Sequence, residues 1–210
     1  SPVEDVSDIQ LQTALASGAY RASVDFSSVA KAAVITICVP TPLDHKREPD
    51  LSLLQSAATA IAPFVSNDTI VVSESTSYPG TLRDIIIPTV DSLKPKDSVK
   101  VYFASAPERV NPGDPVWNQK NTPRLVGAVD SASQVKALAF YESICDVVVA
   151  VSSPEVAEAA KAVLGLEDEC ALSTETFWEW VIEDNFADPA DAALLSQCGV
   201  RVTAQVHSYE

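Results

Sequence analysis

Residues 33–44 read AVITICVPTPLD, an apolar and β-branched run that stops at a stiff Pro-Thr-Pro segment. Two further apolar runs stop in the same way: SESTSYPGT (73–81) follows residues 70–72, and SAPERVNPG (105–113) follows residues 101–104. Runs of this kind predict buried strands, and parallel strands present their carboxyl ends at one edge of a sheet. Three polar strand ends in succession therefore predict one ligand cleft and, with it, a small-molecule enzyme.

Strand and helix patterns alternate along most of the chain. A capping box at Ser7 and a stop at Gly18 predict a first helix, followed by a short strand near 22–25 and a brief helix at 28–32. We then expect strands at 33–39, 69–73, 99–104, 124–128 and 147–151, and helices at 51–64, 81–92, 131–144 and 154–164. This alternation predicts an α/β fold with a Rossmann-like, doubly wound parallel sheet.

Composition narrows the classes of function. The 210 residues are 47% hydrophobic and carry a net charge of −15, which argues against partners such as nucleic acid or an anionic membrane surface. No apolar run is long enough to span a bilayer and no leader is recognisable, so a cytoplasmic location is expected. Two histidines and four dispersed cysteines predict no metal site. Cys38 and Cys145 are expected to be buried, reduced thiols.

One motif of dinucleotide-binding folds is missing from the sequence. Such folds open with Gly-x-Gly-x-x-Gly, which cradles a pyrophosphate at a helix N-terminus. The chain has 6 glycines and none of them cluster. The sequence therefore predicts no pyrophosphate cradle within these residues.

Four segments carry a resemblance to a known family. VPTPLDHKREPDLS (39–52), SESTSYPGT (73–81), APERVNPGD (106–114) and VSSPEVAEAAK (151–161) closely resemble the UDP-glucose/GDP-mannose dehydrogenase family. The first segment looks most like the UDP-N-acetylhexosamine 6-dehydrogenase branch. The resemblance covers residues 1 to about 163 and implies NAD as cofactor and a UDP-sugar as substrate. It further implies oxidation of the C6 hydroxyl to a carboxylate in two NAD-dependent steps.

The resemblance also implies roles for individual residues. It makes Thr76, Glu108 and Lys161 catalytic, as the water-positioning hydroxyl, the catalytic carboxylate and the oxyanion-stabilising amine. It places Glu108, Arg109 and Lys161 against the substrate. The residues expected to line the NAD site are Val39, Pro40, Thr41, Pro42, Ser75 and Thr76. Thr76 also precedes a Pro-Gly turn into a helix N-terminus, where an anionic or polar ligand group could bind.

The residues alone leave simpler interpretations open. The Pro-Thr-Pro segment could be only a rigid turn, and Glu108 a surface carboxylate paired with Arg109. Lys161 could be a solvated helix lysine paired with Glu158, three residues earlier. Glu74 could be a general base by type, but a glutamate at a strand end is more often solvated.

The family pattern breaks at both ends. At the start, the chain looks as though it lacks the first βαβ unit. After Lys161, the family carries a Lys-x-x-x-Asn motif, but this chain has Gly165 at the position of the asparagine. The Gly-rich loop with the nucleophilic cysteine is missing. We therefore expect a fragment that is inactive or severely impaired.

The C-terminal tail has a different character. Residues 174–210 resemble a segment of long-chain mannitol dehydrogenases and hexuronate reductases. The expected organisation is a truncated NAD-binding domain (1–152), the start of a central helix (153–165) and a mainly helical tail (166–210). The alternatives are a piece of a polyol or hexuronate NAD-dependent dehydrogenase, and a non-catalytic interaction module. Family members are usually oligomers, so a homo-oligomer is a further expectation.

Overall fold

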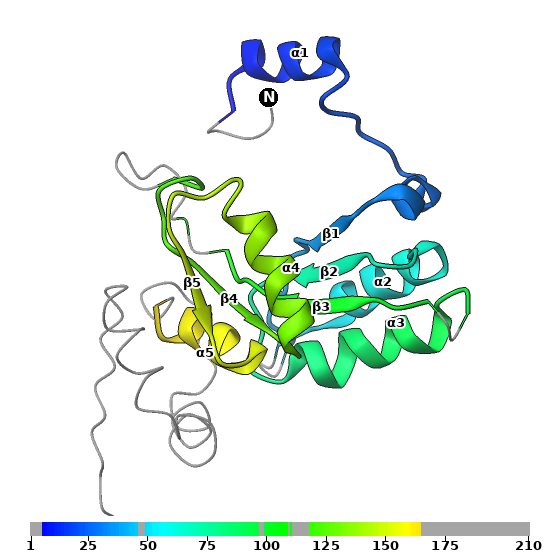
Figure 1. Ribbon diagram of the computed structural model, residues 1–210, viewed down its shortest axis with the longest axis vertical. Coiled ribbons are helices and arrows are strands. Elements are labelled where there is room, and N and C mark those ends of the chain that lie inside the picture. The colour runs from blue at the N-terminus through cyan, green and yellow to red at the C-terminus, as the bar shows by residue number, and fades with distance from the viewer. Residues whose placement is uncertain (1–5, 46–48, 97–98, 109, 111–117, 165–210) are drawn as a thin grey trace, which may run out of the picture.

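The computed structural model describes residues 6–45, 49–96, 99–108, 110 and 118–164, and its centre is a five-stranded sheet between helices (Figure 1). The strands lie side by side in chain order. They are β1 (Val34–Ile37), β2 (Ile70–Ser73), β3 (Tyr102–Ser105), β4 (Arg124–Ala128) and β5 (Val148–Val151). Each lies within two or three residues of an expected strand, so the apolar runs predicted the sheet correctly.

The direction of two strands differs from the prediction. β1, β2 and β3 are parallel, and β5 is parallel to β4, but β4 runs antiparallel to β3 through the pair Ser105 and Gly127. The predicted parallel, Rossmann-like sheet is thus confirmed for three of the four strand pairs, and β3 with β4 is the exception. Antiparallel neighbours need no crossover helix, and the described residues between β3 and β4 form none.

Helices cover both faces of the sheet, as expected for a Rossmann-like fold. On one face, Ile35, Val71 and Phe103 pack with α2 (Ser52–Ile61) and α3 (Ile87–Leu93). On the other, Val72 and Ala104 pack with α4 (Ser131–Tyr141). Alternate strand residues supply the two cores because successive side chains of a strand point to opposite faces. Two 3₁₀ helices, Phe26–Lys31 and Ala62–Phe64, and a π-helical turn, Leu82–Ile86, complete these layers.

The last described helix, α5 (Pro154–Leu164), contacts β3, β4 and β5. A glycine makes this close contact possible. A Cβ atom at Gly127 would come within 2.0 Å of the Ser153 carbonyl oxygen, so only glycine lets the start of α5 lie directly on β4. Of the helices in the described part of the chain, none is both long enough and apolar enough to cross a membrane.

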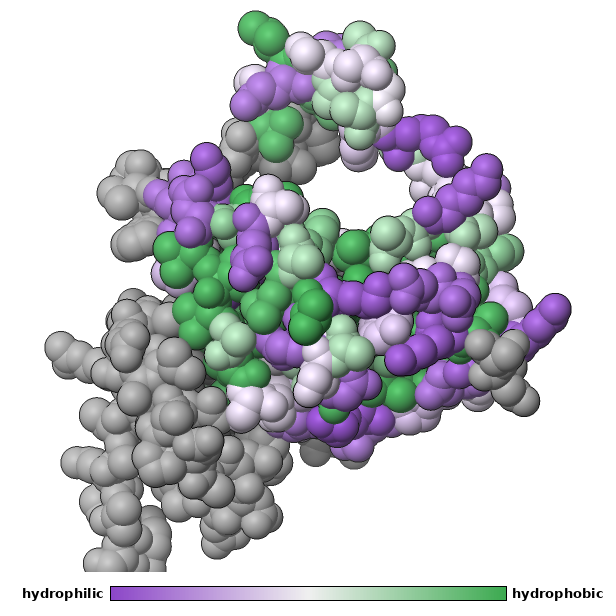
Figure 2. Space-filling model, viewed as in Figure 1, coloured by the Kyte–Doolittle hydropathy of each residue, from purple (hydrophilic) through white to green (hydrophobic). Residues whose placement is uncertain are grey.

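The first helix stands apart from the sheet. α1 (Asp8–Ser17) has the expected capping box at Ser7, and Gly18 ends it with a φ of 72°. No residue of α1 is buried, and Figures 1 and 2 show open space between this helix and the body of the domain. The strand expected near 22–25 is absent, because no neighbouring strand pairs with it and Val24 is 96% exposed.

Candidate active site

The loops that follow β1 and β2 are bonded to each other at the carboxyl edge of the sheet. The Thr41 hydroxyl donates to the Thr76 carbonyl oxygen at 2.5 Å. The Ser75 hydroxyl accepts from the Val39 N–H at 2.9 Å and donates to the Val39 carbonyl oxygen at 2.8 Å. Ser75 is buried, so its hydroxyl is a fixed support for the Pro-Thr-Pro loop.

The loop after β3 joins the same edge. The Ala106 N–H donates to the Ser73 carbonyl at 2.9 Å, and the Glu108 N–H donates to the Glu74 carbonyl at 3.1 Å. The Glu108 carboxylate accepts from the Val110 N–H. Three motifs far apart in the sequence therefore lie together, as the polar strand ends predicted.

The predicted site residues fall into three groups. Thr41, Thr76 and Glu108 are half-buried, so each is held by the protein and still reachable from outside. The backbone of Lys161 lies in α5, but its side chain is outside the description. Arg109 and the tail from residue 165 onward lie outside the described residues.

Sequence reasoning missed a buried polar group beside these loops. The Glu74 side chain is only 15% exposed, and its Oε1 accepts from the Tyr141 hydroxyl at 2.5 Å. Its Oε2 lies 4.0 Å from Nη1 of Arg124, whose side chain is 5% exposed. The interpretation of Glu74 as a solvated strand-end glutamate is wrong. The available signal was an arginine opening the apolar run RLVGA (124–128).

The Tyr141 hydroxyl and the Cys38 thiol, which both bond to Glu74, have raised pKa values. Burial, with the Glu74 carboxylate next in importance, raises the pKa of the Tyr141 hydroxyl far above its ordinary 10.0. The same two causes raise the pKa of the Cys38 thiol to about 11. Cys38 is exposed as a residue, contrary to the prediction, although its Sγ donates to Glu74 Oε2 at 3.5 Å. Cys145 is buried as predicted.

Glu158 is a second buried carboxylate near the site. It is 1% exposed, and it accepts from the Gly80 N–H at 2.8 Å and from the Leu82 N–H at 3.2 Å. These two bonds tie Glu158 to the segment after β2; the expected pairing with Lys161 involves a side chain outside the description. Glu158 also occupies the helix N-terminus that the sequence offered to a ligand. Burial raises its pKa to about 8.

Three buried hydroxyls near the ends of β2 and β3 have no hydrogen-bond partner among the residues that the structure describes. They belong to Ser73, Ser77 and Ser105. Ser73 and Ser105 are neighbours across the two strands. Buried polar atoms are normally satisfied, so these hydroxyls are available to water or to a polar ligand group. The carboxyl edge therefore holds both bonded loops and unused hydrogen-bonding capacity.

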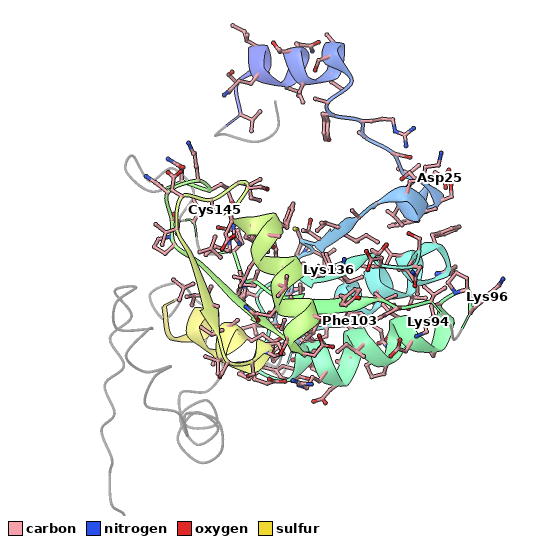
Figure 3. All side chains as sticks on the ribbon, in the orientation of Figure 1. Asp25, Lys94, Lys96, Phe103, Lys136 and Cys145 are labelled. Carbon is pink, nitrogen blue, oxygen red and sulfur yellow. The ribbon has the colours of Figure 1, made fainter. Side chains whose placement is uncertain are left out.

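One open groove lies away from these loops and is lined by none of the predicted site residues. Its volume is about 480 Å³, and it lies between α3, the segment leading into β3 and Asp130. Lys94, one of its lining residues, is paired with Asp91 at 2.8 Å. Figure 3 shows Lys94 and Lys96 at the far end of α3, well away from Cys145. The clustering of motifs, and not this groove, identifies the candidate site.

Comparison with known proteins gives the same family as the motifs. Residues 2–145 match the model of the UDP-glucose/GDP-mannose dehydrogenase family, NAD binding domain. Protein CapL of Staphylococcus aureus is 36% identical over 135 residues, which are 63% of this chain and 32% of that protein. The UDP-N-acetyl-D-mannosamine dehydrogenase of Methanocaldococcus jannaschii is 34% identical over 134 residues, or 62% and 30% of the two chains.

Solved structures agree with this match. A UDP-D-ManNAc dehydrogenase structure from Pyrococcus horikoshii has a TM-score of 0.68 at 28% identity, covering 78% of this chain and 40% of that one. The chain spans about a third of the length of the curated relatives it matches. The family model ends before the tail, so the likeness of residues 174–210 to mannitol dehydrogenases stays an expectation. The chain belongs to the UDP-glucose/GDP-mannose dehydrogenase family of NAD-dependent oxidoreductases, and it matches the NAD-binding domain of that family.

Proposed function

We propose that this chain supplies NAD-site and catalytic loops of a nucleotide-sugar 6-dehydrogenase that acts on a UDP-N-acetylhexosamine. The observation that carries the proposal is the direct bonding of the motif loops: Thr41 to Thr76, and Glu108 to Glu74. Relatives named UDP-N-acetyl-D-mannosamine dehydrogenase and UDP-N-acetyl-D-glucosamine 6-dehydrogenase support the substrate class.

The chemical character of the edge fits one part of NAD. Half-buried threonine hydroxyls and unpartnered serine hydroxyls suit ribose hydroxyls and a carboxamide. In this proposal the residues that hold NAD are Val39, Pro40, Thr41, Pro42, Ser75 and Thr76. Bound NAD would supply the hydride acceptor. The 210 residues contain no Gly-x-Gly-x-x-Gly to hold its pyrophosphate, so the affinity of this chain should be weaker than about 1 mM.

The side chains have distinct tasks in this proposal. Glu108 accepts a proton as general base, and Thr76 holds a water beside it. Lys161 stabilises negative charge on the substrate oxygen, and Arg109 contacts the substrate. The reaction converts the C6 hydroxyl to a carboxylate in two oxidations, with the chain alone inactive or severely impaired. A cytoplasmic location belongs to the same proposal.

A ligand titration followed by NMR tests the proposal. NAD⁺ added to about 10 mM, roughly ten times the expected Kd, should shift the amide signals of Thr41, Thr76 and Glu108. Thr41→Val, which removes only the hydroxyl, should weaken these shifts. Lys94→Ala, in the distant groove, should leave them unchanged.

The opposite results are equally specific. Shifts confined to the α3 groove, or no shifts at 10 mM NAD⁺, would contradict the cofactor assignment. Low-micromolar affinity would contradict the argument from the missing pyrophosphate cradle. UDP-N-acetyl-D-glucosamine, added in a second titration, should shift the amide signal of Glu108. If that signal does not move, the substrate assignment is wrong.

A further inference from the structure

Four side chains form a polar cluster, the Glu74 cluster, at the carboxyl edge of the sheet; two follow β1 and β2 directly, and the others come from β4 and α4. Its members are Cys38, Glu74, Arg124 and Tyr141. The Glu74 carboxylate accepts from the Tyr141 hydroxyl at 2.5 Å and from the Cys38 thiol at 3.5 Å, and its other neighbour is Arg124 at 4.0 Å. Arg124 also lies over the Tyr141 ring, 5.4 Å from its centroid. Each side chain of the cluster is therefore held in place by at least one other member.

The cluster is connected to the loop that carries Glu108. Nη1 of Arg124 donates to the Ala106 carbonyl oxygen at 3.1 Å, and its Nη2 donates to Gln119 at 2.6 Å. Two residues beyond Ala106, the Glu108 N–H donates to the backbone carbonyl of Glu74. The segment 106–108 is thus held at one end by the Arg124 side chain and at the other by the Glu74 backbone.

The antiparallel direction of β4 explains how Arg124 comes to this place. Arg124 is the first residue of β4, and β4 pairs with β3 only through the last residues of each strand. The beginning of β4 therefore extends past the carboxyl end of β3, directly beside residues 106–108. In a parallel β4 the first residue would lie at the opposite edge of the sheet.

We propose that Glu74 and Arg124 are positioning residues that hold Glu108 at the carboxyl edge of the sheet. The proposal rests on the proposed function, in which Glu108 acts on the substrate. Arg124 supplies two donors in one rigid plane, which bridge Ala106 and Gln119 while the guanidinium remains beside the Glu74 carboxylate. A lysine has a single donor centre and cannot make all of these contacts.

Local amide exchange in the 210-residue protein tests the proposal without cofactor or substrate. In Arg124→Lys, exchange of the Glu108 amide should accelerate about tenfold, which corresponds to roughly 1.4 kcal/mol of local opening. The Ile70 amide, bonded to Ala33 on the far side of β2, should not change. Glu74→Ala should act like Arg124→Lys. Glu74→Gln, which keeps an acceptor for the Tyr141 hydroxyl, should restore most of the protection.

The matched control is Lys120→Gln, in an exposed ion pair with Asp146 at 3.5 Å, and it should leave Glu108 unchanged. A built-in reporter checks that the charge has gone. Because the Glu74 carboxylate helps to raise the pKa of the Cys38 thiol, Glu74→Gln should speed alkylation of Cys38 at pH 9, with buried Cys145 unaffected. If Arg124→Lys does not fold, Tyr141→Phe, which removes one bond to Glu74, takes its place.

Two results would overturn the proposal. One is unchanged Glu108 exchange in folded Arg124→Lys and Glu74→Ala. The other is an equal increase in the exchange rate of the Ile70 amide, since equal increases at both sites indicate general destabilisation of the fold. Failure of the proposed function is a separate result: protection of Glu108 that depends on Arg124, but no shift at the edge with NAD⁺ or UDP-sugar, keeps the positioning geometry and removes the catalytic assignment.

Discussion

Two glutamates at the carboxyl edge are both removed from water, but by different partners. Glu158 is held by two backbone N–H groups, those of Gly80 and Leu82, and is 1% exposed. Glu74 is held by side chains and is 15% exposed, with the Arg124 guanidinium 4.0 Å away. The first arrangement ties one helix to another, whereas the second supports a loop.

The difference matters because the two kinds of partner respond differently to mutation. A side-chain partner can be changed by itself, so the Glu74 cluster can be dissected one bond at a time. Backbone donors cannot be removed, so loss of the Glu158 carboxylate leaves two N–H groups without this acceptor, one part-buried and one buried. Truncation of Glu158 should therefore lower the free energy of unfolding more than removal of any single bond of the Glu74 cluster.

The largest effect is expected for Glu158→Ala. Two amide donors lose their acceptor and a buried cavity forms, so the free energy of unfolding should fall by about 3 kcal/mol. Urea denaturation at pH 7 measures this loss. Glu158→Gln keeps one acceptor oxygen and should lose less than half as much. Equal losses in the two variants would show that the hydrogen bonds to Gly80 and Leu82 contribute little.

The pH dependence of stability should come next. The pKa of Glu158 in the folded protein, about 8, lies above its ordinary value of 4.5, so folding favours the protonated form. Its contribution to stability is therefore complete below about pH 4.5 and is lost as the pH rises to about 8. We expect a fall on the order of 3 kcal/mol between pH 5 and pH 8.

Denaturation at a series of pH values, compared between wild type and Glu158→Gln, measures this contribution. The difference between the two proteins should change over that window. Four carboxylates have lowered pKa values and titrate at more acidic pH, outside this window: Asp25, Asp50, Asp68 and Asp130. A constant difference from pH 5 to pH 8 would show that Glu158 is ionised throughout.

The Glu74 cluster should show a smaller effect. Tyr141→Phe removes one hydrogen bond to the Glu74 carboxylate and keeps the aromatic ring in the core, so the free energy of unfolding should fall by about 1.5 kcal/mol. Thermal denaturation measures the change. A loss as large as that of Glu158→Ala would mean that side-chain and backbone partners are equivalent here.

The sequence predicted most of this fold for a physical reason. Apolar runs report burial, so all five strands and the helices after them were located within a few residues. Such runs do not indicate the direction of a strand, so they could not predict the antiparallel pairing of β4 with β3. The first strand, near 22–25, was wrong because local composition cannot supply a neighbouring strand.

The candidate site was predictable to the extent that it follows strand ends. Thr41, Thr76 and Glu108 come directly after three parallel strands, and the structure brings their loops together. The two backbone partners of Glu158, Gly80 and Leu82, lie 78 and 76 residues earlier, so helical spacing could not reveal them. Tertiary contacts of this kind leave no local pattern in the sequence.

The smallest effect is expected for an ion pair beside Glu158. Nε of Arg83 lies 2.5 Å from Oε1 of Glu155, and this pair joins the same two elements as the Glu158 carboxylate does. The Arg83 side chain is 45% exposed, so solvent screens the attraction and both chains lose rotational freedom. Arg83→Gln should therefore lower the free energy of unfolding by only about 0.5 kcal/mol.

The effect of Arg83→Gln should shrink further in 1 M salt, whereas that of Glu158→Ala should not, because the buried bonds to backbone amides lie outside the reach of counterions. Paired urea denaturations at low and high salt measure both responses. A loss of 2 kcal/mol or more for Arg83→Gln would reverse the argument. The attachment of α5 to the loop after β2 would then depend mainly on the exposed charge pair, and Glu158 would be the lesser of the two contacts.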